Sequence, residues 1–519
     1  MSIDLKEDDS VSIGTTWYSK EQCTNNFQQV INRISQGFKP KEAELSTLDK
    51  IAIEKQKIIN QQGQNFLEEI FRNNSQRAIY VSNVQIEGTE QFRDDFLTKQ
   101  ILPFINKSNN LNNLLNNIDT VSGNFFKSGA VENLAIQLTT GTGLNFKSGY
   151  YPENSIEIIP HIKLIPVKKF MAKTGTNIGN GEGDGYMTFQ FRNIFGGGEN
   201  LILDATTGTR TRSSYLLNYS SPGFGSNTNW KFDNSLFFTS RKIDWSSHEQ
   251  LIKGMNNKIV SMNIPNGKNQ DQGLINHEFS IENILRSITN VSPMASNNIL
   301  FHAGDDFKTS FIYKFAYDSR NDRTLPTKGD YFSLVNEISG ILPNLNTSKF
   351  LKQSFESQIA RNFIDGDHII NLSLRGGWLY SLNKTTHLMD RFYLGGPNDI
   401  RGFFFNGLGP RNFNDTLGGD IFLSGGLSTF HRLPFVSKES NFKFHNFINF
   451  GRLIPLDKNE NFTTTLKELI NEPSIGIGTG IVFKHPVARF ELNFVLPVTA
   501  HENDSIRKGL QYGIGLSFM

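Results

Sequence analysis

The sequence predicts a mainly β protein, a sixteen-stranded antiparallel transmembrane β-barrel that follows one small βααββ domain. Three observations lead to this fold class. From residue 167 onward, segments of about ten residues alternate apolar and polar side chains between turn residues. The 44 phenylalanines and 45 glycines favour many strands joined by glycine turns. The chain contains no apolar run of about 18 residues that could form a transmembrane helix.

Charge and composition exclude several classes of function. The net charge of +2 over 519 residues gives no field that would attract nucleic acid. A single cysteine, Cys23, excludes an internal disulfide framework. The ten histidines are scattered and no nucleophile motif occurs, so we expect no metal, no cofactor and no enzyme. The acidic start, MSIDLKEDDS, is unlike a secretory signal or an Arg-rich mitochondrial presequence.

Residues 1–78 are polar, and we expect them to be partly disordered. Apolar residues recur at spacings of three, four or seven between Pro40 and Phe71, which predicts an amphipathic helix there. This helix could pack on the next domain or dock on a partner or a membrane surface.

Residues 79–166 form the βααββ domain, in which two helices cover a small sheet. The expected elements are a strand at 79–86, a helix from Thr89 as N-cap through Gln100, a helix around 111–118, and strands at 131–139 and 156–167. An exposed edge of such a sheet could accept an extended client strand. A plain scaffold that spaces the barrel from its partners is the alternative.

Residues 167–519 form the predicted barrel, with a long inward-folded loop at 383–417. The expected strands are 167–179, 185–194, 199–211, 213–221, 228–242, 250–264, 272–287, 306–320, 328–340, 350–364, 367–382, 418–432, 441–453, 474–485, 487–498 and 509–518. An even number suits antiparallel closure. A short helix is expected at 466–471.

Period-two alternation alone does not say which face of a strand is buried. Phe490, Leu492 and Phe494 alternate with Arg489, Glu491 and Asn493, and a soluble sandwich would bury the apolar set. The size favours the membrane, because about 350 residues of strands without helical cover would make a very large sandwich.

The run RFYLGGPNDIRGFFFNGLGPR at 391–411 is the most unusual stretch of the chain. It is rich in glycine, yet it carries five aromatic residues that favour burial and an arginine in its middle. We predict that it folds back into a cavity, where Arg401 meets a carboxylate or carbonyl group. A glycine-rich surface loop with incidental aromatics is the alternative.

This run carries a family resemblance. Its segments RFYLGGP at 391–397 and IRGF at 400–403 resemble the sixth-loop signature of the outer-membrane β-barrel insertase superfamily. Within the superfamily, the chain from about residue 79 to 519 is most similar to core subunits of the mitochondrial sorting and assembly machinery (the SAM complex). The βααββ segment resembles a polypeptide-transport-associated (POTRA) domain.

The resemblance implies a functional loop and a partner for its arginine. The loop residues are Asp399, Ile400, Arg401, Gly402 and Phe403. In bacterial relatives the arginine meets acidic residues on the strands that follow, whereas Ser428 and Asn449 are neutral here. Asp420 is the nearest acidic candidate for the partner of Arg401, and the sequence leaves this partner open.

The C-terminal stretch QYGIGLSF resembles the β-signal of mitochondrial outer-membrane barrels. The alternative is a last barrel strand without a signalling role, and the two interpretations are compatible. Gln511, Gly513, Leu516 and Phe518 fill the polar, glycine and two hydrophobic positions of the signal. A lateral gate is implied between this strand and the first one. The first-strand gate residues are Phe170, Ala172, Thr174, Gly175, Thr176 and Ile178.

By resemblance, the protein is an insertase of the mitochondrial outer membrane with its POTRA domain in the intermembrane space. Its partners are β-barrel precursors, accessory subunits of a sorting and assembly complex and membrane lipid, without nucleic acid or cofactor. A client β-signal would take the place of the last strand. The alternatives are a solute-conducting channel, which is a different class of function, a protein-translocating pore of the same superfamily, and a soluble β-rich interaction protein.

Overall fold

The computed structural model describes most of the chain after residue 72. The described ranges are 73–107, 110–140, 155–179, 182–223, 227–261, 273–342, 348–363, 368–382, 385–434, 436, 440–457, 462–485 and 488–515, together with 55, 61–63 and 69. The amphipathic helix predicted between Pro40 and Phe71 lies almost wholly outside them. Among the described residues, no helix is both long and apolar enough to span a membrane.

The N-terminal described part has the predicted βααββ order, with its first strand split in two. Its elements are β1 (Ile79–Val81), β2 (Gln85–Glu87), α3 (Asp94–Lys107), α4 (Leu111–Lys127), β3 (Val131–Thr140) and β4 (Ile156–Pro166). β1 and β2 pair in parallel with successive segments of β4, and β3 pairs antiparallel with it. Phe96, Phe104, Leu114 and Phe125 are almost fully buried between the helices and the sheet. Asn110 caps α4 by accepting a hydrogen bond from the Asn113 N–H.

The prediction that Thr89 caps the first helix was wrong, because α3 begins at Asp94. Gly88 has φ +79°, and a turn in which the Phe92 N–H donates to the Thr89 carbonyl follows it. The polar groups of this turn are used by the connection at 193–199. The Arg93 N–H donates to the Gly196 carbonyl, and Asn193 Nδ2 donates to the Gln91 carbonyl. A helix starting at Thr89 would consume these groups.

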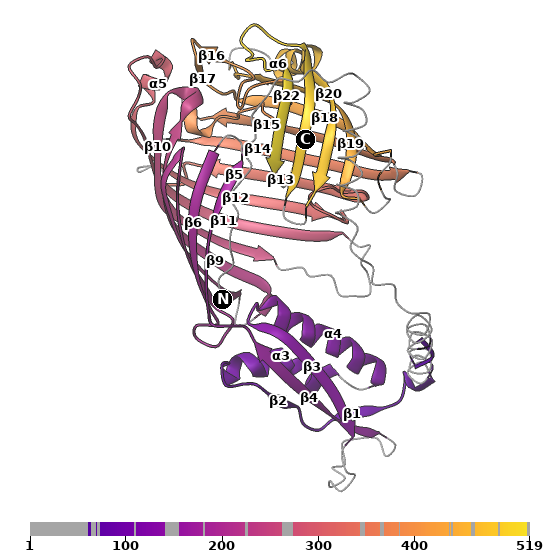
Figure 1. The fold of residues 1–519 in the computed structure, drawn as a ribbon. Coiled ribbons are helices and arrows are strands. Elements are labelled where there is room, and N and C mark those ends of the chain that lie inside the picture. The colour runs from indigo at the N-terminus through magenta and orange to yellow at the C-terminus, as the bar shows by residue number, and fades with distance from the viewer. Residues whose placement is uncertain are drawn as a thin grey trace, which may run out of the picture. The chain divides into compact units, whose positions relative to one another are not determined.

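The barrel consists of sixteen antiparallel strands in one sheet, as predicted (Figure 1). They are β5 (Phe170–Gly179), β6 (Glu182–Arg192), β7 (Asn200–Gly208), β8 (Thr211–Gly223), β9 (Asn227–Ile243), β10 (His248–Ser261), β11 (Leu274–Thr289), β12 (Gly304–Asp318), β13 (Gly329–Ser339), β14 (Phe350–Phe363), β15 (His368–Ser381), β18 (Ile421–Arg432), β19 (Phe442–Ile454), β20 (Ser474–Lys484), β21 (Arg489–Thr499) and β22 (Gly509–Gly515). Every neighbouring pair from β5 to β22 is joined by a ladder in sequence order.

The burial pattern decides between a membrane barrel and a soluble sandwich. On β21 the apolar Leu492 and Phe494 are 49% and 61% exposed, whereas Glu491 and Asn493 are 3% and 2% exposed. The same inversion occurs on β15, where Leu372 is exposed and Asn371 is buried. A sheet with its apolar side chains outside and its polar side chains inside needs lipid around it.

Because the strands are antiparallel, their connections alternate between the two ends of the barrel. One end, which we call the loop end, carries α5 (Asn297–Phe301), α6 (Phe462–Asn471) and the hairpin of β16 (Arg411–Asn412) and β17 (Asp415–Thr416) (Figure 1). The predicted helix at 466–471 is therefore present and begins earlier, at Phe462. The described part of the long loop, residues 385–417, also starts from this end.

Candidate functional site: the inward loop and the barrel seam

The long loop packs against the inner wall of the barrel through a small apolar core of its own. Ile400 and Phe403 are fully buried, and Leu394 and Leu408 are nearly so. They pack with Phe422 of β18 and Leu453 of β19. Leu394 and Leu408 also pair through a backbone bridge. These loop side chains are therefore buried on the wall and are not exposed as they would be on a surface loop.

Glycine allows both the path of the loop and its close contact with the wall. Gly402 has φ +95°, a conformation that L side chains rarely adopt. On the wall, a Cβ at Gly476 of β20 would overlap the Arg401 carbonyl oxygen, and one at Gly451 of β19 would overlap the Ile400 side chain. The loop thus lies directly on the backbone of two wall strands.

Arg401 is fully buried and lies between three wall side chains. Its Nε and Nη2 atoms lie 3.0 Å and 2.9 Å from Glu491 Oε2. Its Nη1 atom donates to Asn449 Oδ1 at 2.9 Å. The guanidinium carbon lies 4.6 Å from the centre of the Phe447 ring, which adds a cation–π contact. The cation is therefore held by a carboxylate, an amide and an aromatic face.

The candidate pair of Arg401 with Asp420 was wrong. Asp420 precedes β18 and lies 3.8 Å from Arg391, and it accepts a hydrogen bond from the Leu456 N–H. The partner of Arg401 is Glu491, ninety residues along the chain, which reaches the same point because β21 is close to β19 in the sheet. Its place on the polar face of a predicted strand was the only sequence signal for this residue.

Glu491 lies at the centre of a buried polar cluster. Its Oε1 atom pairs with Arg489, and its Oε2 atom accepts a hydrogen bond from Asn493 Nδ2 at 2.7 Å. Arg489 in turn lies 4.8 Å from the Phe430 ring. One carboxylate thus stands between two arginines inside the barrel. Among the described residues, no group of three or more His, Cys, Asp or Glu side chains is arranged to hold a metal ion.

Asp399 fixes the turn that precedes the arginine. Its Oδ2 atom accepts a hydrogen bond from the Gly395 N–H at 2.7 Å, and its Oδ1 atom pairs with Arg375 of β15. The Asp399 N–H donates to the Gly396 carbonyl, which closes the turn. All five predicted loop residues, 399–403, therefore form one contact surface on the wall.

The same loop holds the last strand and the segment that precedes it. The Gly402 N–H donates to Gln511 Oε1 at 3.2 Å, and Asn398 Nδ2 donates to the Ile514 carbonyl at 2.9 Å. Phe403 and Ile506 form a backbone bridge, and Phe404 and Arg507 N–H groups donate across it to Ser505 and Gly402. The predicted functional loop and the predicted β-signal are thus in direct contact.

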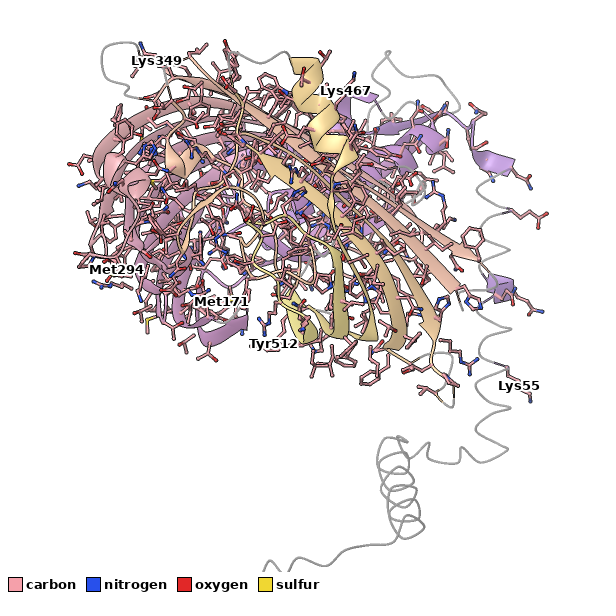
Figure 2. The ribbon with its side chains drawn as sticks, turned by 90° about the horizontal axis from the view of Figure 1, so that it is seen from above. Lys55, Met171, Met294, Lys349, Lys467 and Tyr512 are labelled. Carbon is pink, nitrogen blue, oxygen red and sulfur yellow. The ribbon has the colours of Figure 1, made fainter. Side chains whose placement is uncertain are left out.

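The sheet begins at β5 and ends at β22, and these two strands form a seam. They lie side by side, with Met171 on β5 and Tyr512 on β22 marking the two sides in Figure 2. Over the part of the seam that the structure describes, no ladder of backbone hydrogen bonds joins them. Every other neighbouring pair of barrel strands has such a ladder.

The predicted gate residues divide between described and undescribed positions. On β22, Gln511 faces the interior at 2% exposure and Gly513 is buried beside it, while Leu516 and Phe518 lie outside the described residues. On β5, Phe170 is exposed and packs beside Phe191 at 5.1 Å, and Thr174 Oγ1 donates to the Tyr186 carbonyl. The remaining first-strand positions, Ala172, Gly175, Thr176 and Ile178, continue the strand, and the side chain of Ile178 is not described.

Comparisons with known proteins agree with this architecture. The family model of the Omp85 superfamily domain matches residues 193–518. The "Sorting assembly machinery 50 kDa subunit" of Saccharomyces cerevisiae is 32% identical over 85% of this chain and 95% of its own length. A SAM50-like protein of Schizosaccharomyces pombe is 32% identical over 87% of this chain and 94% of its own length.

A solved structure also has the same fold. BamA from Haemophilus ducreyi lacking POTRA domains 1–3 superimposes with a TM-score of 0.64 over 84% of each chain, at 14% sequence identity.

The polar interior and apolar outer face of the barrel, together with the similarity to sorting and assembly machinery subunits, define an outer-membrane β-barrel protein. The chain belongs to the Omp85 superfamily and, within it, to the family of Sam50 subunits of the sorting and assembly machinery.

Proposed function

We propose that this protein folds and inserts β-barrel precursors into the mitochondrial outer membrane through a lateral gate between β5 and β22. One observation carries the proposal: in the described residues, this is the only pair of neighbouring barrel strands without a backbone ladder. Unpaired backbone groups in lipid cost several kcal/mol each, so an edge of this kind attracts an incoming strand. Membership of the Sam50 family supports the same function.

The client β-signal would pair with β5 in place of β22. Residues 170–176 of β5 form the receiving edge, and the client supplies the positions that Gln511, Gly513, Leu516 and Phe518 fill in this chain. No cofactor or hydrolysis is required, because each strand that enters lipid with satisfied hydrogen bonds lowers the free energy. The loop contacts with Gln511 and Ile514 hold the last strand until the client arrives.

The βααββ domain at 79–166 is, in this proposal, a POTRA domain in the intermembrane space. The similarity of the chain to a BamA structure that lacks POTRA domains 1–3 supports it. The partners are the precursors, the accessory subunits of a sorting and assembly complex and the surrounding lipid. A protein-translocating or solute-conducting channel is the alternative, and the loop packed on the inner wall argues against a wide pore.

The experiment that tests the function is depletion of the protein followed by import of labelled β-barrel precursors into isolated mitochondria. We expect precursors to cross the outer membrane and then to stay unassembled, because the edge that receives them is missing. Re-expression of this chain should restore assembly. Normal assembly in depleted mitochondria, together with a loss of conductance, would support the channel alternative instead.

A second prediction concerns the role of the βααββ domain and of its contact with the barrel in precursor assembly. Deletion of residues 79–166 is expected to slow precursor assembly, while the barrel still inserts, because the sheet edge is no longer available to clients.

Arg93→Ala should have a milder effect on the assembly rate, about two- to fivefold, because it removes only a partly exposed ion pair, Arg93 Nη2 to Glu199 Oε1 at 2.6 Å. Both effects are measured as assembly rates on native gels.

Lys99→Ala is the matched control, because the Lys99–Asp95 pair is an exposed ion pair of the same domain within α3. It should assemble precursors at the normal rate. If the deletion instead prevents insertion of the protein itself, the domain is a folding element and its role as a receptor is refuted.

A further inference from the structure

A second buried ionic cluster holds the beginning of the inward loop, on a different part of the wall. Asp390, at the end of the short 3-10 helix η2 (Leu388–Asp390), is 3% exposed. Arg286 of β11 binds its carboxylate with two parallel hydrogen bonds, Nη1 to Oδ1 at 2.6 Å and Nη2 to Oδ2 at 2.8 Å. Arg286 Nε also donates to Asp306 of β12 at 2.5 Å. This bidentate geometry fixes the direction of Asp390 as well as its distance.

The surroundings of the pair strengthen this anchor. Lys352 Nζ of β14 donates to the Asp390 backbone carbonyl at 2.7 Å and lies 4.5 Å from the centre of the Phe392 ring. Ser348 joins Arg286 and Asp306, because it accepts from Arg286 Nη2 at 2.8 Å and donates to Asp306 at 3.0 Å. Backbone and side chain of Asp390 are therefore both bound to the wall.

The charges around Asp390 favour its carboxylate form, and burial favours the neutral form of the nearby histidines. Burial alone would raise the pKa of Asp390, but the charge and hydrogen bonds of Arg286 lower it below its usual value. Burial lowers the pKa of His387 to about 3 and that of His302 to about 4, so neither ring is charged at pH 7. The positive charges facing Asp390 come from Arg286, Lys352 and, at 4.0 Å, Lys308.

Two of the polar attachments of the loop lie far apart in the sheet. Asp390 is bound to Arg286 of β11 and Lys352 of β14 and lies 4.0 Å from Lys308 of β12, whereas Arg401 is bound to β19 and β21. The contacts with the last strand, made by Asn398 and Gly402, lie beside the second point. Together with the pair of Asp399 with Arg375 and the apolar contacts of Leu394 and Ile400, these attachments restrict the residues between them.

We propose that Asp390 and Arg286 are positioning residues that hold the loop so that Asn398 and Gly402 bind β22 and the segment before it. Apart from each other, their described polar partners on the wall are Asp306, Lys308, Ser348 and Lys352, none of which belongs to β5 or β22. Asp390 and Arg286 act on the seam indirectly, because Arg401 lies eleven positions after Asp390 and the loop between them is held in place. The inference rests on the proposed function only for its consequence in assembly, because the positioning itself is measured without a client.

The test is hydrogen–deuterium exchange on the full-length protein in lipid nanodiscs. In Asp390→Asn, the N–H groups of Gly402, Phe404, Ser505 and Arg507 should exchange about tenfold faster, because they pair the loop with β22 and the segment before it. Asp330→Asn is the matched control, because Asp330 forms an exposed pair with Arg361 at 2.6 Å. It should leave these four N–H groups unchanged.

A milder variant gives an independent check. Lys352→Met removes the hydrogen bond to the Asp390 carbonyl and the cation–π contact with Phe392 but keeps the bidentate Arg286 pair, so it should raise exchange of the same groups by a smaller factor, about threefold. If exchange rises only in β11 and β12 in the variants, Asp390 stabilises these strands alone and does not position the loop, which overturns the inference. Unchanged exchange in both variants overturns it as well.

Measuring the rate of precursor assembly in the same variants distinguishes a failure of this inference from a failure of the proposed function. Faster exchange with slower assembly supports both. Faster exchange with normal assembly leaves the positioning role intact and contradicts the need for the loop contacts with β22 in insertion.

Discussion

Glu491→Gln is expected to destabilise the barrel more than Arg401→Ala, and both are expected to lower precursor assembly severely. Loss of Glu491 leaves Arg401 and Arg489 facing each other without the carboxylate between them. Breaking a buried pair in this way costs about 3–5 kcal/mol. Loss of Arg401 leaves Glu491 with Arg489, so charge remains balanced and the cost is closer to that of a charged hydrogen bond, about 1.5–3 kcal/mol.

The two variants are compared by denaturant unfolding of the purified barrel and by assembly of imported precursors. In Arg401→Ala the barrel should still insert, while the loop becomes sensitive to added protease. Arg361→Ala removes an exposed pair at the edge of the barrel and should change neither readout measurably. If Arg401→Ala assembles clients at the wild-type rate, the arginine has no part in the mechanism. If it proves less stable than Glu491→Gln, the assignment of Glu491 as the shared counter-ion is wrong.

Locking the seam with a disulfide is expected to stop assembly completely. The single natural cysteine is first replaced by Cys23→Ser. Cysteine pairs are then introduced with one member in 170–176 of β5 and the other in 511–515 of β22. Pairs whose Cα atoms are about 4.4–6.8 Å apart will bridge. Oxidation should block client entry, because β22 can no longer leave β5, and reduction should restore it.

A client peptide with its own cysteine in the β-signal provides the complementary measurement. It should cross-link to 170–176 and compete with the intramolecular bridge. The matched control is Leu492→Cys with Tyr512→Cys, which are paired residues on the outer faces of β21 and β22. This bridge leaves the seam free, so assembly should continue. Normal assembly by the seam-locked protein would show that clients do not enter between β5 and β22.

Much of the fold could be predicted because its signals are local. Each barrel strand shows period-two alternation over about ten residues, and each turn carries glycine or polar residues. Sixteen predicted segments therefore correspond one to one with sixteen strands, with ends displaced by a few residues. The loop was recognisable for the same reason, because aromatic side chains among glycines indicate a buried turn.

The partner of Arg401 could not be predicted because it depends on register and sheet order. Asp420 is nineteen residues from Arg401 in sequence. The residue that contacts Arg401 is Glu491, which is ninety residues away. The pairing of Asp390 with Arg286, 104 residues earlier in the chain, is a second case. The start of α3 is a third, because the barrel connection at 193–199 binds the turn that Thr89 was expected to cap.

The sequence by itself therefore determined which residues form strands, which loop turns inward and which residue in it needs a counter-ion. These properties follow from the periodicity and chemistry of neighbouring residues. Only the tertiary structure decided which face of each strand meets lipid, which carboxylate meets each buried arginine, and that the loop binds β22. Those choices arise when the strands are brought together in one register, so that residues about a hundred positions apart share the barrel interior.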